Sequence, residues 1–267
     1  LLLALSAQHH LPIISTTTST GSSTATDSST VLLSSRFEVV GDVLMLPESY
    51  LSGPQWDNIL GLHFDTAGNP TSTEVAATVQ YRTEIFATLA QCFGLKRIAR
   101  KAEIDSGPKR ESKVRLLYPV VGIADRTGPG SEGWVTVYEN KIGFSFDITR
   151  VMFCSGNVTE RMRMGKQFSS GDIVVDLYSG IGYYTIPLLY HGKAEHVHAC
   201  EWNPNSVLAL RHNLQQAGVY HRCTVYEGDN QISSQQLNSL ADRVSLGLLP
   251  SSVPGWPLAV RALKKTG

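Results

Sequence analysis

One segment constrains the fold more than any other: a short apolar run that ends in acidic and aromatic residues and is followed at once by two glycines. The run spans Asp172–Tyr178, and the glycines are Gly180 and Gly182. A continuous run of valine, isoleucine and leucine predicts a strand that is buried on both faces. Glycines after such a strand let the backbone approach a ligand closely, and the helix that follows offers free N–H groups. The segment therefore predicts a ligand-binding turn between a strand and a helix.

The alternation of strand and helix continues downstream. Further strands are expected at 196–201, 222–227 and 243–249, and helices at 183–190 and 205–217, the second ended by Gly218. Apolar strands that alternate with helices indicate a parallel sheet covered on both faces, with ligands bound outside the carboxyl ends of the strands. This part of the chain is therefore predicted to be an α/β domain.

The preceding segment is less regular and predicts a small α+β domain over 36–150. A helix is expected from about Glu74 to Gly94, and Asn140 is the expected tip of a hairpin. Strands are expected at 37–47, 113–117, 133–139 and 141–147. Before this domain, thirteen of the sixteen residues from Ser15 to Thr30 are Ser or Thr. Such a composition buries too little apolar surface to fold, so we expect residues 1–35 to be disordered.

The glycine turn distinguishes between two classes of ligand. A dinucleotide fingerprint requires a third glycine where this sequence has Thr185. Asp176, at the end of the strand, would repel a pyrophosphate but can attract the ammonium of an amino acid, or else orient the turn. These features favour S-adenosylmethionine, which carries a cationic sulfonium and an amino-acid tail, over NAD.

Two further acids follow the next two strands. Glu201 ends the second strand, where its carboxylate can accept hydrogen bonds from both ribose hydroxyls. Asp229 follows the third strand, where it can accept from the adenine amino group while Asn230 adds an amide. An acid after one strand is often a solvated turn residue. Three in register at consecutive strand ends strengthen the prediction of an S-adenosylmethionine site over 151–267.

Four motifs, in order, resemble a known family. They are Met152-Phe153-Cys154-Ser155-Gly156-Asn157-Val158-Thr159-Glu160-Arg161, the turn from Asp176 to Gly182, His198-Ala199-Cys200-Glu201-Trp202-Asn203-Pro204, and the segment from Asp242 to Ser252. Together they resemble the eukaryotic tRNA wybutosine-synthesising aminocarboxypropyl transferases, which are relatives of the tRNA guanine-37 N1-methyltransferases. The resemblance extends upstream to about residue 36.

The resemblance implies a class I methyltransferase-like, Rossmann-like fold. It implies transfer of the 3-amino-3-carboxypropyl group of S-adenosylmethionine to C7 of 4-demethylwyosine at position 37 of phenylalanine tRNA. The family's donor contacts fall on Glu201, Asp229 and Asn230, on a basic residue matched by Arg161, and on a residue, usually Ser, that is Cys154 here. Arg161 is expected to hold the donor carboxylate through two parallel hydrogen bonds. The alternative interpretation is that Arg161 is a charged residue on the protein surface.

Two other functions remain open. One is methylation of guanine-37 or another tRNA base, and the other is tRNA binding without turnover. At the exit of the fourth strand, Leu249-Pro250-Ser251-Ser252 replaces the Asn or Asp, Pro-Pro and aromatic residue of amino-directed methyltransferases. This difference argues against methylation of an exocyclic amine. No residue is identified as the general base.

Charge and cysteine content bear on partners and location. The chain has 23 Lys and Arg against 23 Asp and Glu, so it does not hold nucleic acid by bulk charge. Between Arg82 and Arg115, however, there are nine cations and four acids, a cluster that can contact phosphates. The resemblance implies that the partner is the anticodon region of phenylalanine tRNA. The four cysteines have no CxxC spacing. We therefore expect reduced thiols, no metal site, no membrane span and a cytoplasmic monomer.

The number of strands raises one more expectation. Four parallel strands are predicted before Gly267, whereas the resemblance implies seven in the order 3-2-1-4-5-7-6. The chain is thus expected to be part of a longer, carboxyl-terminally extended enzyme. The strand at 243–249 would then be an unpaired apolar edge, which favours aggregation. We expect the chain as written to be poorly soluble or inactive.

Overall fold

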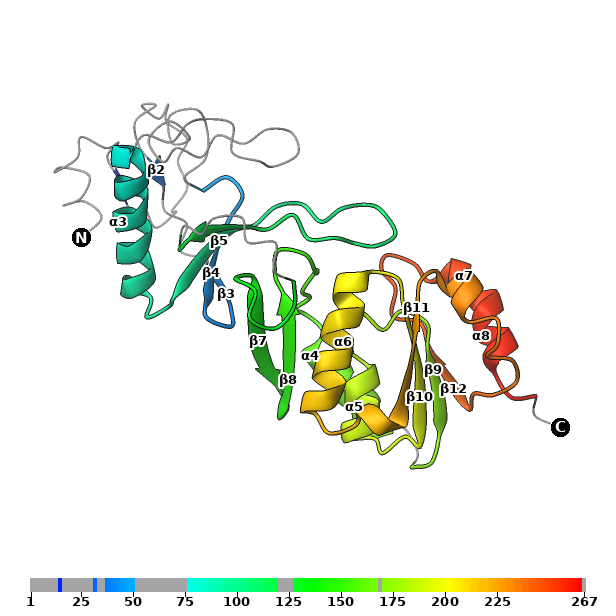
Figure 1. Ribbon diagram of the computed structural model, residues 1–267. Coiled ribbons are helices and arrows are strands. Elements are labelled where there is room, and N and C mark those ends of the chain that lie inside the picture. The colour runs from blue at the N-terminus through cyan, green and yellow to red at the C-terminus, as the bar shows by residue number, and fades with distance from the viewer. Residues whose placement is uncertain are drawn as a thin grey trace, which may run out of the picture. The chain divides into compact units, whose positions relative to one another are not determined.

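The computed structural model describes residues 14–15, 31–32, 37–50, 76–119, 127–167 and 170–265, and divides into two compact units (Figure 1). The first comprises residues 1–103 and 114–123, and the second residues 104–113 and 124–267. The second unit therefore begins before residue 151. It also includes the loop at 104–113, although the residues on both sides of that loop belong to the first unit. Most of the segment predicted to be disordered lies outside the described residues. The described part of that segment consists of β1 (Ile14–Ser15) and β2 (Val31–Leu32), which form a short parallel pair.

The first unit has a four-stranded sheet and one long helix. The strands are β3 (Glu38–Val40), β4 (Val43–Leu46), β5 (Arg97–Arg100) and β6 (Arg115–Tyr118), in that order across the sheet. The helix, α3 (Ala76–Cys92), connects the parallel pair β4 and β5. It ends before Gly94, whose φ of +64° glycine adopts without strain. The run predicted as a strand at 37–47 is a pair of antiparallel strands, β3 and β4. The predicted helix is present, and β5 has no counterpart in the prediction.

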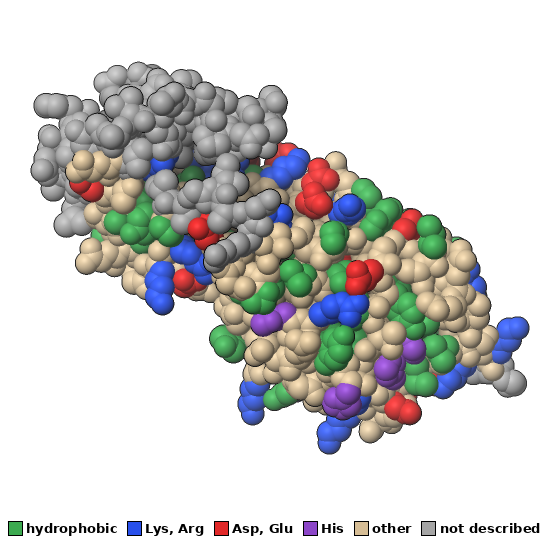
Figure 2. Space-filling model, in the orientation of Figure 1, with side chains coloured by type: hydrophobic (Ala, Val, Ile, Leu, Met, Phe, Trp, Pro, Cys, Tyr) green, Lys and Arg blue, Asp and Glu red, His purple; other side chains and the backbone are tan. Residues whose placement is uncertain are grey.

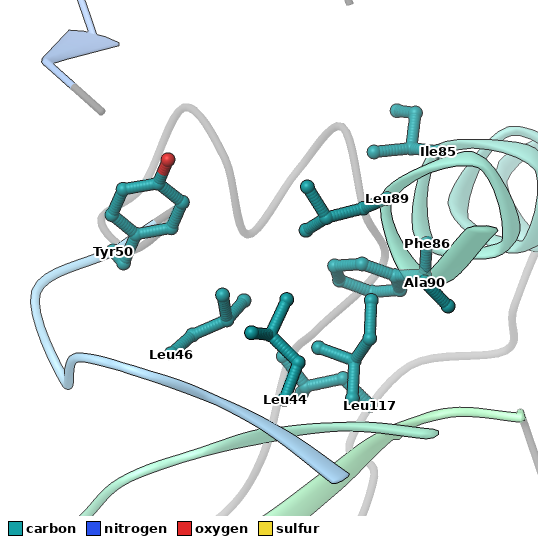
Figure 3. Close-up of a cluster of buried hydrophobic side chains, with 9 residues drawn as sticks. Leu44, Leu46, Tyr50, Ile85, Phe86, Leu89, Ala90 and Leu117 are labelled. Carbon is teal, nitrogen blue, oxygen red and sulfur yellow. The ribbon is translucent and has the colours of Figure 1, made fainter. Parts of the chain in front are cut away.

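A single apolar cluster holds this helix on the sheet, as Figure 3 shows. Ile85, Phe86 and Leu89 recur along α3 at helical spacing, and they are buried against Leu44 and Leu46 of β4. All four side chains of β4 are buried, so this strand is covered on both faces. The first unit is thus a small sheet with one helix, and the strands predicted at 133–139 and 141–147 as part of the same domain lie in the second unit.

The second unit begins with the predicted hairpin. Strands β7 (Trp134–Glu139) and β8 (Ile142–Asp147) pair antiparallel. Asn140 and Lys141 both have positive φ, +50° and +69°, as a tight two-residue hairpin turn requires. The buried amide of Asn213 attaches this hairpin to a neighbouring helix. It accepts the Ser145 N–H at 2.8 Å and donates to the Ser145 and Ile181 carbonyls at 3.0 and 3.1 Å.

The rest of the second unit is a parallel sheet between layers of helices (Figure 1). Its strands are β9 (Ile173–Asp176), β10 (His196–Glu201), β11 (Cys223–Glu227) and β12 (Arg243–Ser245). Their order is β11-β10-β9-β12, which matches the first four strands of the expected order 3-2-1-4. The helices α4 (Val158–Gln167), α5 (Thr185–Tyr190) and α6 (Pro204–Gln216) lie on one side, and α7 (Asn230–Ser233) and α8 (Trp256–Ala262) on the other. The α/β class is confirmed.

Two details differ from the sequence prediction. Helix α4 was not predicted, because its residues were assigned only to a motif, and β12 is three residues long where seven were expected. Beyond Ser245 the chain leaves the sheet and enters a 3-10 turn, Val253–Gly255, that leads into α8. Within the described ranges, none of the helices combines the length and the apolar character needed to cross a bilayer.

Candidate functional site

A pocket of about 400 Å³ opens at the carboxyl ends of β9, β10 and β11, all within the second unit. Its volume falls in the range of about 300–1,000 Å³ that is usual for small-molecule sites. Of the eight residues proposed from sequence, the pocket wall contains Gly180, Glu201, Asp229 and Asn230. The sheet thus brings together residues that are 50 positions apart in sequence, because parallel strands end at one edge.

Glu201 is the most constrained acid of the pocket. One carboxylate oxygen, Oε2, accepts the Gly180 N–H at 2.7 Å, and the other, Oε1, accepts the N–H groups of Trp202 and Asn203 at 2.9 and 2.8 Å. Burial raises the pKa of this carboxyl, although the three N–H donors counteract the shift. A carboxylate offers about four lone-pair positions. One position on Oε2 is therefore left for a ligand hydroxyl in this conformation.

Asp229 and Asn230 form the adjacent wall. Asp229 caps α7, and its Oδ1 accepts the Gln231 N–H at 2.9 Å. Asn230 donates from Nδ2 to the Leu177 carbonyl at 2.8 Å, which fixes the start of α7 to the end of β9. Oδ2 of Asp229 and Oδ1 of Asn230 are not used by these bonds. Both residues therefore retain a hydrogen-bond acceptor for a ligand that carries amino or hydroxyl groups.

The two glycines of the turn have different roles. Gly180 lies on the pocket wall, has φ +56°, and donates its N–H to Glu201, so it joins the turn to β10. Gly182 is buried, has φ +102°, and does not line the pocket. A Cβ at position 182 would lie 2.6 Å from Ile186 Cδ1 and 3.0 Å from Leu210 Cδ1. Gly182 is thus needed for the packing of the turn against α5 and α6.

Asp176 lies behind the pocket wall. Its side chain is fully buried, and Oδ2 accepts the Thr185 hydroxyl at 2.8 Å. Oδ1 is 3.5 Å from the Tyr178 N–H. Burial raises the pKa of this carboxyl, while the bonds from Thr185, Tyr178 and Ser245 lower it. These contacts correspond to the second of the two expected roles, orientation of the glycine turn.

Arg161 and Cys154 also lie off the pocket wall. The guanidinium of Arg161 is 2% exposed, donates to Glu139 and to the Cys154 carbonyl, and stands 4.3 Å from the Tyr183 ring centroid. Tyr183 in turn accepts the Cys154 N–H at 3.2 Å and donates to the Met152 carbonyl at 3.3 Å. Both Tyr183 and Met152 line the pocket. Arg161 is therefore a buried, paired residue that reaches the pocket through Tyr183, and the surface-charge alternative does not apply.

Sequence analysis missed one wall of the pocket. This wall of the pocket is formed by residues 106–110, which lie in the loop at 104–113 of the second unit. Tyr178, Trp202 and Leu248 also line the pocket. The aromatic positions follow strand ends and could have been inferred from that placement. The loop lies more than 60 residues before β9 and carries no pattern that links it to the sheet. Only the folded chain reveals it.

The pocket suits a ligand of the chemistry inferred from the sequence. Carboxylate and amide oxygens at the strand ends match hydroxyl and amino donors, and Leu177, Tyr178 and Trp202 provide apolar surface for a base. Over the described ranges, no three His, Cys, Asp or Glu side chains are grouped as a metal ion requires.

Known proteins resemble this chain in sequence and in structure. Residues 135–267 match the TRM5/TYW2 methyltransferase domain. A tRNA wybutosine-synthesizing protein 2 homolog of Danio rerio is 42% identical over 231 residues, which cover 86% of this chain and 48% of that protein. The chain thus spans about half the length of this curated relative.

Solved structures agree with the sequence match. P. horikoshii TYW2, crystallised with MeSAdo, is 26% identical, with a TM-score of 0.60 over 86% of this chain and 68% of that one. The M. jannaschii tRNA m1G37 methyltransferase is 20% identical, with a TM-score of 0.57 over 87% of this chain and 57% of that one. The second likeness shows a shared fold only.

Proposed function

The chain belongs to the TRM5/TYW2 methyltransferase family through its residues 135–267, and from this premise we propose that it is an aminocarboxypropyl transferase acting on tRNA. The donor is S-adenosylmethionine. The acceptor is C7 of 4-demethylwyosine at position 37 of phenylalanine tRNA. The observation that carries the proposal is the pocket in which Gly180, Glu201, Asp229 and Asn230 meet at the ends of three adjacent strands.

The reaction is a displacement at carbon. C7 of the base attacks the γ carbon of the aminocarboxypropyl group, the bond from that carbon to sulfur breaks, and its electron pair remains on sulfur. The sulfonium becomes the neutral thioether methylthioadenosine, and the proton on C7 is lost. Three carbons of a sulfonium are open to attack, so the orientation of the donor decides which group moves. A relative that binds MeSAdo supports this choice, because methyl transfer leaves S-adenosylhomocysteine instead.

The residues of this chain contribute binding and orientation. Glu201 accepts a ribose hydroxyl at its remaining acceptor position, and its three N–H donors hold the carboxylate in place. Asp229 and Asn230 accept from the adenine edge. Tyr183 and Met152, fixed by Arg161, form part of the wall beside the glycine turn. None of these roles requires the protein to donate a proton.

A double-label experiment tests the proposal. Phenylalanine tRNA that carries 4-demethylwyosine is incubated with the chain and with S-adenosylmethionine labelled either in the methyl or in the carboxyl carbon. We expect the carboxyl label in tRNA and the methyl label in free methylthioadenosine. The variant Glu201→Gln keeps the size of the side chain but weakens its acceptor, so it should incorporate less of the carboxyl label.

The same experiment separates the two rivals. For this purpose it includes a parallel incubation with unmodified phenylalanine tRNA, because 4-demethylwyosine occupies position 37 of the first substrate and leaves no guanine-37 to methylate. Methyl label in either tRNA would indicate a base methyltransferase, the activity named for the M. jannaschii neighbour. No label from either donor, together with no heat of S-adenosylmethionine binding in calorimetry, would indicate a tRNA-binding protein without turnover.

Three further properties are proposed on the same basis. We propose that the tRNA contact is the anticodon region, that the working form is a monomer, and that the protein is cytoplasmic. Footprinting on tRNA, sedimentation at assay concentration and imaging of a tagged full-length protein test them in turn.

A further inference from the structure

The pocket is lined by two cations as well as by the acids at its strand ends. Ser106, Gly107, Pro108, Lys109 and Arg110 form one wall of the pocket, from a loop that packs on the second unit although its sequence neighbours belong to the first. Lys109 is exposed and Arg110 is half-buried. Two cations therefore line the same pocket as Glu201 and Asp229.

Several bonds hold the loop against the second unit. The buried amide of Asn203 donates to the Lys109 carbonyl at 3.1 Å, and Arg110 Nη2 donates to the Leu249 carbonyl at 2.9 Å. Ser112 donates its hydroxyl to the Ile148 carbonyl at 2.7 Å. Asn203 follows Glu201 by two residues, so one anchor of the loop adjoins the donor-binding acid. The positions of Lys109 and Arg110 relative to the pocket are fixed by the fold.

The charges of these two residues are not neutralised within the loop. Asp105 pairs with Lys113 at 3.3 Å, and neither Asp105 nor Glu111 lines the pocket. In the described part of the chain, the Lys109 ammonium has no ion pair, and Arg110 contacts a neutral carbonyl. Other members of the predicted basic cluster differ in this respect, since Arg97 pairs with Asp42 and Lys101 with Glu38.

We propose that Lys109 and Arg110 bind a backbone phosphate of the nucleic acid strand whose base enters the pocket. The inference rests on the proposed function, because that function makes a tRNA the acceptor. A polyanion that approaches from solvent meets the exposed Lys109 first, and a guanidinium with free N–H groups can pair with phosphate oxygens bidentately. Phosphate contacts of this kind fix position and register without reading sequence.

Equilibrium binding of a labelled, unmodified phenylalanine tRNA transcript tests the assignment. The proteins are the whole chain, Lys109→Ala, Arg110→Ala and a matched control, Lys166→Ala. Lys166 is an exposed lysine in the last turn of α4 and does not line the pocket. Each protein is also titrated with S-adenosylmethionine, and circular dichroism compares the folding of the variants.

We expect Lys109→Ala and Arg110→Ala to weaken tRNA binding by roughly tenfold each, the loss of a charge-assisted contact. The slope of log affinity against log salt should fall by roughly one for each phosphate contact removed. Lys166→Ala should change neither quantity, and all proteins should bind S-adenosylmethionine equally.

Other outcomes overturn the proposal in distinguishable ways. Variants that bind tRNA with the affinity and salt slope of the unaltered chain would remove the loop assignment and leave the proposed function in place. Variants that lose S-adenosylmethionine binding alone would assign the cations to the donor carboxylate. If the unaltered chain binds neither ligand, the proposed function itself fails.

Discussion

At the scale of single residues, the main question is what a charged side chain pairs with. Arg161 was expected from family resemblance to hold the donor carboxylate. Its guanidinium is instead occupied by Glu139, the Cys154 carbonyl and the Tyr183 ring. A buried ion pair contributes little net stability but is costly to break, because the remaining partner is left as an unpaired buried charge. Arg161 is therefore a positioning residue in this conformation.

A double-mutant cycle tests this role. Arg161→Met and Glu139→Gln should each lower the free energy of unfolding by about 3 kcal/mol, and the double variant should lose less than the sum. Urea denaturation provides the measurement. Exchanging Glu160 for Gln and Arg163 for Met removes an exposed pair on the same helix, with side chains 44% and 49% exposed, and should leave stability unchanged within error.

Donor affinity distinguishes positioning from direct contact. If Arg161 acts through Tyr183, both Arg161→Met and Glu139→Gln weaken S-adenosylmethionine binding in calorimetry. If Arg161 holds the donor carboxylate directly, Glu139→Gln frees the guanidinium, and binding stays equal or becomes tighter. That second pattern would contradict the positioning role.

At the scale of elements, the turn between β9 and α5 depends on two glycines with positive φ for different reasons. Gly180 presents its N–H to Glu201 at the pocket, whereas Gly182 avoids a clash with α5 and α6. The buried carboxylate of Asp176 also holds this turn, because it accepts a hydrogen bond from the Thr185 hydroxyl. The turn is thus a packed structural unit, and the shape of the pocket depends on this packing as well as on its wall residues.

Replacing Gly182 by Ala should destabilise the chain by roughly 2–4 kcal/mol, from strained φ together with overpacking against Ile186 and Leu210. Gly218→Ala is the matched control. Its φ is +69°, and no atom lies within 4 Å of an added Cβ, so only a backbone cost of about 1 kcal/mol is expected. Equal losses in thermal or urea unfolding would mean that packing at Gly182 is unimportant.

At the scale of the whole molecule, the net charge is zero, but the charged residues are unevenly distributed along the chain. The surplus of cations between Arg82 and Arg115 is partly neutralised by Asp42 and Glu38, which lie outside that segment. On the face shown in Figure 2, Lys and Arg side chains are interspersed with Asp and Glu side chains. Within the segment from Arg82 to Arg115, Lys109 and Arg110 are the cations that line the pocket. Contact with tRNA is therefore expected to depend on where a few charges lie more than on their total.

The segment after β12 exposes a group of apolar side chains. Val253 is 52% exposed, Trp256 55% and Val260 73%, while Leu258 and Ala262 of α8 are buried against the sheet. Strand β12 itself pairs only with β9 among the described strands. Contiguous exposed apolar surface beside an open strand edge promotes self-association.

We therefore expect the chain to scatter light at micromolar concentration, and Val260→Glu to reduce that scattering without lowering the melting temperature. Tyr138→Glu is the control, since Tyr138 is an isolated apolar side chain, 80% exposed, at the hairpin. If the unaltered chain remains soluble and monomeric by sedimentation, or if both variants improve solubility equally, the segment is not the cause.

The sequence by itself determined the strands of the parallel sheet and the edge at which the pocket lies. Strands β9 to β11, the glycine turn and the acids that follow each strand are local patterns, and parallel strands must end together, so Glu201, Asp229 and Asn230 could be placed. The hairpin tip at Asn140 was predictable for the same reason, because a turn is specified by its own residues.

Only the tertiary structure decided how distant side chains pair. It buries Asp176 beneath the turn, pairs Arg161 with Glu139 across 22 positions, and brings the loop at 106–110 to a pocket built by residues after 150. Sequence periodicity reports which face of an element is buried, but it carries no information about which partner covers that face. The surroundings of Arg161 and of Lys109 depend on those partners, and so only the fold reveals them.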